Sequence, residues 1–243
     1  MNMKYPLYKQ QGLTLIELMV ALVISLLILA GLFTVYQSNN RAYRISDGLV
    51  RVQENGRFAL DFIVRELRMA GFPAIDSNLR NQVGGTEGTG PNNSDTLIIR
   101  NNTGNDCIGH AVAGVVQNTY TIVDTGRTNQ QGNAIMALDC NGTELVEGIE
   151  NLQVLYGVDT DTERDGIPNR YVDANNVAVV SNGWQRVVTV RVALLANSGE
   201  ELATVSSART FRMLGTNLGP YNDRLMRREY ISTVLLNNYL YDY

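Results

Sequence analysis

GLTLIELMVALVISLLILAGLF, residues 12–33, is too long and too apolar for an ordinary surface helix. From Leu18 to Phe33 the only polar side chain is Ser25. A helix needs about 20 residues, at about 1.5 Å each, to cross the hydrocarbon of a bilayer. We therefore expect residues 13–35 to form a transmembrane helix.

Glu17 is the exception inside this apolar stretch. A carboxylate there costs roughly 2.5–3.5 kcal/mol on membrane-insertion scales, so it is expected to have a function and a partner. If the chain is cut between Gly12 and Leu13, the new amino terminus lies on the same helix face as Glu17. Glu17 can then neutralise that ammonium group, or the one of a neighbouring subunit. The alternative is a plain signal anchor in which Glu17 has no partner.

The basic residues near the start orient this helix. Lys4 and Lys9 precede the apolar stretch, so the positive-inside rule places residues 1–12 in the cytoplasm and the body of the chain outside it. A secretory signal peptide is excluded, because the stretch is too long and no small-x-small cleavage site follows it. Without these two lysines, 18 of the 20 basic residues remain against 24 acidic ones. This mildly acidic balance gives no reason to expect nucleic acid as a partner.

Residues 36–72 continue the helical pattern, with one apolar and one charged face. The apolar face comprises Ala59, Ile63, Leu67 and Ala70. Gly48 and Gly56 are the weak points of this amphipathic second half, and Pro73 follows its end.

Residues 73–243 are expected to form a β-rich globular head. Residues 74–95 are rich in Asn, Gly, Ser and Thr and predict a loop. Residues 186–195 alternate with period two, which predicts a half-buried strand. The expected strands are 96–100, 119–124, 134–139, 144–158, 185–195, 210–214 and 230–236. Such a series predicts a largely antiparallel sheet and an α+β fold, in which the long N-terminal helix packs on the sheet.

The chain has two cysteines, Cys107 and Cys140. In an exported head they are expected to form one disulfide. The alternative is a metal site made of both cysteines and the lone histidine, His110. Three ligands without a fourth candidate make a poor zinc set.

An acidic loop is the other group of residues that could bind a ligand. Asp159, Asp161, Glu163 and Asp165 alternate with other residues before Gly166, as at the start of a calcium loop. The glutamate expected at position 12 is missing, since Val172 stands there. Calcium at this loop is therefore one interpretation, and a solvated acidic turn is the other. We expect no other cofactor.

The leader and the start of the helix carry a resemblance to a known class. A short basic leader that ends in Gly12, followed by LTLIELMVAL, resembles the signal of type IV prepilins and type II secretion pseudopilins. The resemblance implies that a prepilin peptidase cuts between Gly12 and Leu13 and methylates Leu13. The family usually has Phe where Leu13 stands. The family's assembly glutamate, at the fifth mature position, falls on Glu17.

Three further stretches resemble PilW-type minor pilins: 57–72 (RFALDFIVRELRMAGF), 149–159 (IENLQVLYGVD) and 186–195. This resemblance implies a minor pilin rather than an enzyme. It would prime pilus assembly in a tip complex with other minor pilins, the major pilin and the tip adhesin. Adhesion, twitching motility and DNA uptake would follow from that role. The precursor would lie in the inner membrane of a Gram-negative bacterium with its head in the periplasm, and the assembled subunit in the extracellular pilus.

Two alternatives stay open at this point. A type II secretion pseudopilin of the J type has a similar helix and a similarly large β-rich head, and no sequence feature separates the two. A membrane-anchored periplasmic enzyme or binding protein has less support. The sequence has one histidine and lacks the Gly-x-Ser-x-Gly, His-Glu-x-x-His and phosphate-loop motifs.

Overall fold

The computed structural model of the chain describes residues 12, 14–73, 81–203, 206 and 208–238. The chain forms two compact units, Met1–Ser46 and Asp47–Tyr243. Helix α1, Leu15–Met69, contributes residues to both units. The second unit thus begins inside the helix. The expected segments divide the chain by function instead, into the leader, the transmembrane helix, the amphipathic helix and the head: 1–12, 13–35, 36–72 and 73–243. That division stays a prediction.

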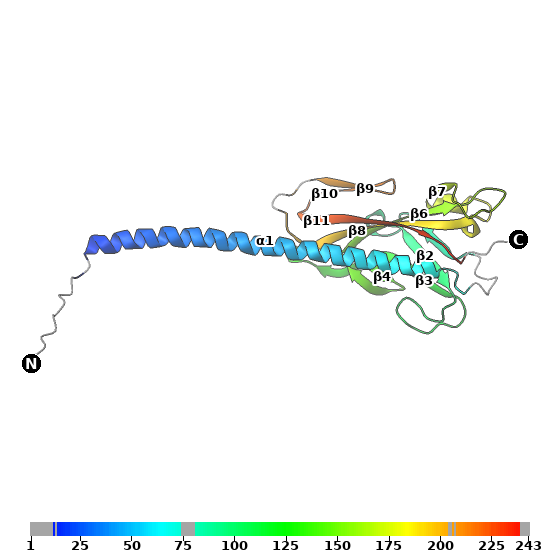
Figure 1. Ribbon diagram of the computed structural model, residues 1–243, viewed down its shortest axis with the longest axis horizontal. Coiled ribbons are helices and arrows are strands. Elements are labelled where there is room, and N and C mark those ends of the chain that lie inside the picture. Colours follow the sequence, from blue (N-terminus) through cyan, green and yellow to red (C-terminus); the bar gives the residue numbers. More distant parts are fainter. Residues whose placement is uncertain (1–11, 13, 74–80, 204–205, 207, 239–243) are drawn as a thin grey trace, which may run out of the picture. The chain divides into compact units, whose positions relative to one another are not determined.

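The unit Asp47–Tyr243 combines the second part of α1 with antiparallel sheets (Figure 1). The first sheet has the order β1-β2-β3-β4-β5 and consists of β1 (Val83–Thr86), β2 (Thr96–Asn101), β3 (Val116–Thr128), β4 (Ala134–Cys140) and β5 (Thr143–Glu147). The second has the order β11-β8-β6-β7 and consists of β6 (Ile149–Val158), β7 (Arg170–Val172), β8 (Val187–Glu201) and β11 (Leu225–Leu235). A separate hairpin pairs β9 (Arg209–Met213) with β10 (Thr216–Tyr221). The short helices are η2 (Pro91–Asn93), α2 (Ala174–Ala178) and η3 (Gly183–Arg186). This confirms the expected fold class.

The expected strands are present with shifted ends, but the prediction of one strand over 144–158 is wrong. Gly148 separates β5 from β6 and has a φ of 80°, the left-handed conformation that glycine adopts without strain. The chain leaves the first sheet there and enters the second. The expected loop 74–95 contains β1, and sequence reasoning missed β7 and β10.

Strand β8 is buried on both faces, although its alternation predicted a half-buried strand. Val190 and Val192 belong to the main core, which also contains residues of α1. Ala193 and Leu195 point to the other face, where they pack against the β9–β10 hairpin. The hairpin therefore covers apolar side chains that the sequence pattern assigned to a solvated face.

The second part of α1 packs on the sheets through the predicted apolar face. Ala59, Ile63 and Leu67 are fully buried in the main core. At the start of this contact, the hydroxyl of Tyr230 in β11 donates to the backbone carbonyl of Val52 at 3.0 Å. This hydrogen bond thus connects β11, the last described strand of the chain, to helix α1.

Side chains before β2 join the two sheets. The backbone N–H of Asp95 donates to the carbonyl of Leu152 at 2.8 Å, and its Oδ2 accepts from the N–H of Val154 at 2.8 Å. Oγ of Ser94 accepts from the N–H of Leu152 at 3.3 Å. Buried backbone donors need partners, and these side chains supply them where β6 lacks a neighbouring strand.

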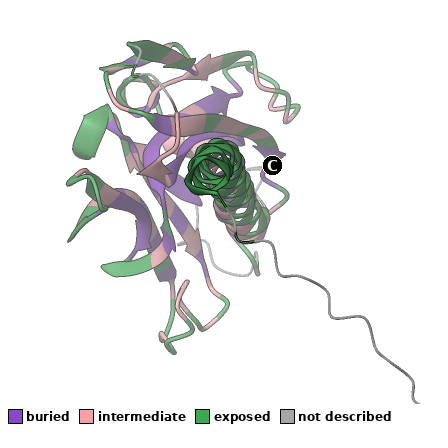
Figure 2. Cartoon of the chain, turned by 90° about the vertical axis from the view of Figure 1, so that its left-hand side faces the viewer, coloured by how far each residue is buried: buried purple, intermediate pink, exposed green. Residues whose placement is uncertain are grey.

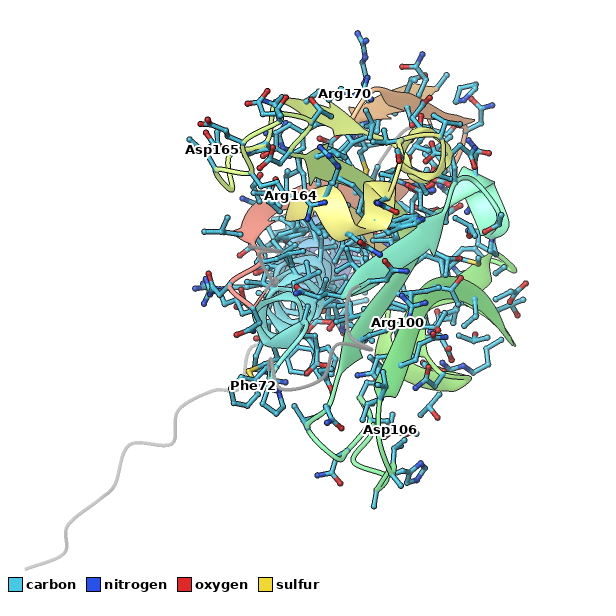
Figure 3. The ribbon with its side chains drawn as sticks, turned by 90° about the vertical axis from the view of Figure 1, so that its right-hand side faces the viewer. Phe72, Arg100, Asp106, Arg164, Asp165 and Arg170 are labelled. Carbon is cyan, nitrogen blue, oxygen red and sulfur yellow. A yellow bond between two sulfur atoms is a disulfide. The ribbon has the colours of Figure 1, made fainter. Side chains whose placement is uncertain are left out.

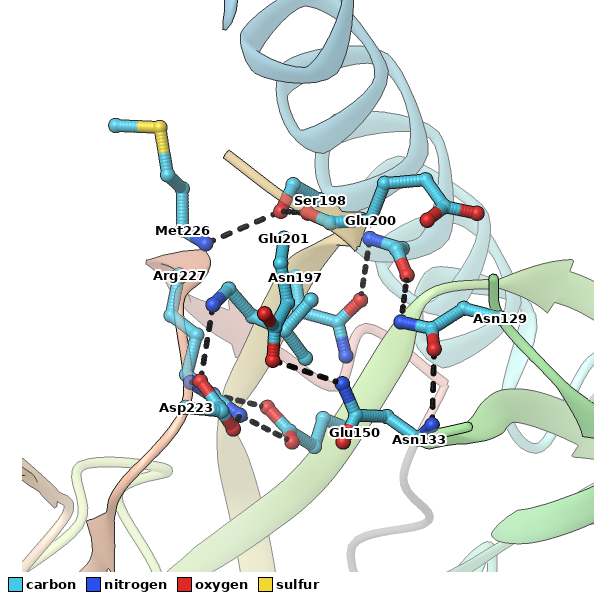
Figure 4. A network of polar contacts seen from close by, with 12 residues as sticks. Asn129, Asn133, Glu150, Asn197, Ser198, Glu200, Glu201, Asp223, Met226 and Arg227 are labelled. Atoms are coloured by element: carbon cyan, nitrogen blue, oxygen red, sulfur yellow. Dashed lines mark hydrogen bonds and ion pairs between the residues drawn. The ribbon is translucent and has the colours of Figure 1, made fainter. Parts of the chain in front are cut away.

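A buried ion cluster ties β11 to β6 across β8 (Figure 4). Nε and Nη2 of Arg227 donate to Glu150 at 2.6 and 2.9 Å, and Nη1 and Nη2 donate to Asp223 at 2.7 and 2.6 Å. Burial alone would lower the pKa of Arg227, but the hydrogen bonds to Asp223 and Glu150 raise it. The guanidinium therefore stays charged and holds the start of β11 in place.

Candidate functional site

In the first unit, Thr14 and Glu17 form an N-terminal cap at the start of helix α1. The backbone N–H and the hydroxyl of Thr14 donate to Oε2 of Glu17 at 3.0 and 2.9 Å. The N–H of Glu17 donates back to Oγ1 of Thr14 at 3.3 Å. This reciprocal arrangement is a capping box, which satisfies backbone donors that the first turn of a helix leaves unpaired. Sequence reasoning missed Thr14, although Thr-x-x-Glu is the signature of this cap.

The predicted partner of Glu17 is the amino group of Leu13, which lies outside the described residues. The leader up to residue 11 lies outside them too, whereas Gly12 is described and exposed. Both Thr14 donors bond to Oε2 of Glu17, and a cut after Gly12 removes neither of them. Capping and pairing with an ammonium group are therefore compatible. Cleavage, methylation and the assembly role of Glu17 stay predictions.

The helix segment that follows the cap is apolar on all sides. Side chains from residue 14 to residue 44 are exposed, as Figure 2 shows in green. The large apolar residues from Leu15 to Tyr36 are each between 52 % and 78 % exposed. Helix α1 is long and apolar enough to cross a membrane. A helix that is apolar all round belongs in lipid or among other helices.

Cys107 and Cys140 form the expected disulfide. Cys107 lies between β2 and β3, and Cys140 is the last residue of β4. Because the two sulfurs bond to each other, they cannot serve as metal ligands with His110, and that alternative is wrong. Nδ1 of His110 lies 3.6 Å from Oδ2 of Asp106 in the same loop.

The acidic loop brings three of its four expected ligands together. Asp159, Asp161 and Asp165 each have an oxygen within 4.8 Å of the others, and Glu163 is not in this group. Asp159 is buried and accepts from the N–H groups of Asp161 and Gly166 at 3.2 and 3.0 Å. In Figure 3 the labelled Asp165 and Asp106 lie at opposite sides of the head. Calcium binding stays a prediction, to be tested by calcium titration of the chain and of Asp161→Asn.

Sequence reasoning missed a second cluster of carboxylate side chains, because its three members come from separate segments of the chain. Glu87 precedes η2, Asp95 precedes β2, and Asp173 caps the start of α2. Burial, followed by the negative charges of Asp95 and Asp173, raises the pKa of Glu87 to about 7. The side chain is only partly buried, and its Oε2 has no hydrogen-bond partner among the described residues. The cluster can therefore change its charge near neutral pH.

Two family models match the chain. The prokaryotic N-terminal methylation motif matches residues 7–33. The type IV pilus-assembly protein W, or PilW, matches residues 111–238, which is more than half of the 243 residues. The chain belongs to the PilW family. The sequence resemblance to PilW-type pilins is thereby confirmed.

The two matches cover different parts of this PilW-family chain. The methylation motif contains Gly12, Leu13 and Glu17, together with most of the exposed apolar segment. The PilW match runs from the loop before β3 to three residues beyond the end of β11, and it includes Cys140 but not Cys107. Membrane anchoring and association with pili follow from the motif and the apolar helix together.

A comparison with curated proteins gave no match. Among solved structures, a type IV-like pilin from Thermus thermophilus is similar to the chain, with 15 % sequence identity and a TM-score of 0.42. The similarity covers 81 % of this chain and 99 % of that one.

Proposed function

We propose that this PilW-family chain is a minor pilin that helps to prime assembly of a type IV pilus. Prepilin peptidase cleaves it after Gly12 and methylates Leu13. It then joins other minor pilins, the major pilin and the tip adhesin in a tip complex. The observation that carries the proposal is the combination of a PilW-matched head with an apolar helix segment that is exposed on all sides.

Assembly follows from the physics of that segment. Its side chains can leave lipid only when other helices take the place of lipid around them, because water is a poor solvent for them. The bundle must also accommodate Glu17, since an unpaired buried charge costs several kcal/mol. Pairing Glu17 with the ammonium group of a neighbouring Leu13 sets the axial register of the subunits. The precursor waits in the inner membrane with its head in the periplasm.

The PilW match favours a pilus over a type II secretion pseudopilus. A membrane-anchored enzyme or binding protein would use the exposed segment as its anchor, but it would leave Gly12 and Glu17 without a role. Adhesion, twitching motility and DNA uptake follow from pilus assembly rather than from chemistry in the head.

The processing step is tested by mass spectrometry of the N-terminal peptide. The chain is isolated from cells with and without a functional prepilin peptidase. We expect a peptide that starts at methylated Leu13 only when the peptidase is present, and Gly12→Leu should abolish it. A chain that keeps its leader in both strains contradicts the proposal.

The assembly role of Glu17 is separated from its capping role by two variants. Glu17→Gln keeps a hydrogen-bond acceptor for Thr14 but removes the charge, so we expect copurification with the other minor pilins to fall by more than about tenfold. Thr14→Val keeps the charge but removes the hydroxyl half of the cap, at about 1 kcal/mol of helix stability. We expect it to assemble nearly normally, with faster amide exchange at the start of α1.

Both variants must first be shown to be processed and present in equal amounts. Loss of copurification in Thr14→Val together with normal copurification of Glu17→Gln would mean that the cap, and not the charge, matters for assembly.

A further inference from the structure

The segment just beyond the apolar run carries unbalanced positive charge. Between Glu17 and Asp47 the only charged residues are Arg41 and Arg44. Both are exposed, and neither has an ion pair among the described residues. By contrast, Arg51 further along α1 pairs with Asp47 at 3.1 Å. Asp47, the carboxylate nearest to Arg44 in the sequence, is thus paired with Arg51, and both Arg41 and Arg44 are left to accept an anion from outside the chain.

The two arginines have a defined depth relative to the apolar run. They lie six and nine residues beyond Val35, or about 9 and 13 Å along the helix axis. Headgroups add about 5–7 Å on each side of the hydrocarbon. Helical side chains lean toward the N-terminus, and an arginine can extend its long stem further in that direction. Both guanidinium groups can therefore reach the phosphate layer when the apolar run spans the bilayer.

The neighbouring side chains suit the same interface. Gln37, Arg41 and Arg44 follow a spacing of four and three residues, so they share one face of α1. Together with three other polar residues, Thr34, Ser38 and Asn40, they line one hollow on the helix surface. No carboxylate lines it. Like charges at this spacing repel, and an anion between them removes the repulsion. Tyr36 and Tyr43 supply the aromatic residues that favour a membrane–water interface.

We propose that Arg41 and Arg44 form a binding site for the phosphate group of anionic phospholipids. This proposal rests on the membrane anchoring included in the proposed function. It adds that lipid binding fixes the depth of the precursor's helix in the bilayer. While the helix is in lipid, the contact fixes how far the apolar run is inserted. The contact must break when the subunit moves from the membrane into a filament, so anionic lipid resists extraction.

The test uses the full chain in mild detergent, titrated with phosphatidylglycerol or phosphatidylcholine, with bound lipid counted by native mass spectrometry. Each arginine near an anionic surface contributes about fivefold in affinity at low salt. We expect the wild type to prefer phosphatidylglycerol by about tenfold or more. Arg41→Gln/Arg44→Gln should lose that preference, and Arg41→Lys/Arg44→Lys should keep most of it. The matched control, Arg51→Gln/Arg57→Gln, removes two arginines from the same helix and should behave like the wild type.

Three results would contradict the proposal, and each one identifies a different step as wrong: the site, the lipid as its ligand, or the membrane anchoring. Equal lipid preference in the wild type and in Arg41→Gln/Arg44→Gln overturns the site. Displacement of the lipid by inorganic phosphate at similar concentration assigns the site to a free anion, and it overturns the assignment to lipid. Flotation with phosphatidylcholine vesicles reports anchoring separately. A chain that does not float contradicts anchoring, and the lipid site with it.

Discussion

The carboxyl group of Glu87 makes the stability of the head depend on pH. Its pKa is about 7 in the folded chain, against 4.5 for an unperturbed glutamate, because of burial and the charges of Asp95 and Asp173. The folded state therefore binds a proton that the unfolded state has already lost between pH 4.5 and about 7. Stability falls as pH rises through this window and stays lower above it.

We expect Glu87→Gln to abolish this fall. At pH 8 the variant should be more stable than the wild type by about 1 kcal/mol, a figure reduced from the full linkage value because Glu87 is partly exposed. Urea denaturation at pH 5 and pH 8 measures the difference. Glu163→Gln, at an exposed loop position, is the control and should not change the pH dependence. A wild-type advantage at pH 8 would contradict the assignment.

At the scale of elements, Gly56 determines how closely α1 approaches β11. A Cβ at Gly56 would lie 2.2 Å from Cε2 of Tyr230, whose hydroxyl is already bonded to the helix backbone. We expect Gly56→Ala to destabilise the head by about 1–3 kcal/mol through overpacking, although alanine favours a helix by about 1 kcal/mol. Gly31→Ala is the matched control, since a Cβ there meets nothing within 4 Å.

The comparison is made by thermal denaturation of the full chain in detergent, followed through the near-ultraviolet signal of the aromatic side chains. If Gly56→Ala melts at or above the temperature of the wild type, Tyr230 can move aside at no cost.

The sequence predicted helices and strands correctly where a residue pattern is compatible with only one type of structure. An apolar run next to an amphipathic run predicted α1, and Ala59 and Ile63 are buried as expected. Gly56 was interpreted as a weak point because propensity alone ignores Tyr230, which follows 174 positions later. The sheet change at Gly148 was missed because the apolar pattern continues through it. Long-range contacts decide such positions, and a local pattern does not contain them.

At the scale of the whole molecule, the disulfide joins the connection between β2 and β3 to the end of β4, across 33 residues. Closing a loop of this length stabilises the folded state by about 3–4 kcal/mol on the chain-entropy model. We expect Cys107→Ser/Cys140→Ser to melt at a clearly lower temperature. Reductant should lower the melting temperature of the wild type and leave that of the variant unchanged. An equal response to reductant in both proteins would show that the loss has another origin.

The sequence also predicted the pairing of Cys107 with Cys140, because an exported chain with two cysteines leaves few options. It could not predict the cluster of Glu87, Asp95 and Asp173, whose members meet only after both sheets have formed. The Thr-x-x-Glu pattern indicates the capping role of Thr14, but the prediction assigned Glu17 a role through its charge alone.

The bond between Tyr230 and Val52 also has a consequence for biogenesis. It closes a contact between residues 178 positions apart, and β11 is the last described strand. During synthesis the helix therefore emerges first, while β11 emerges after all the other described strands. Until β11 is made, the helix around Val52 and Gly56 lacks the cover that Tyr230 provides. A ribosome that stalls late would therefore leave this part of the helix exposed to contacts with other chains.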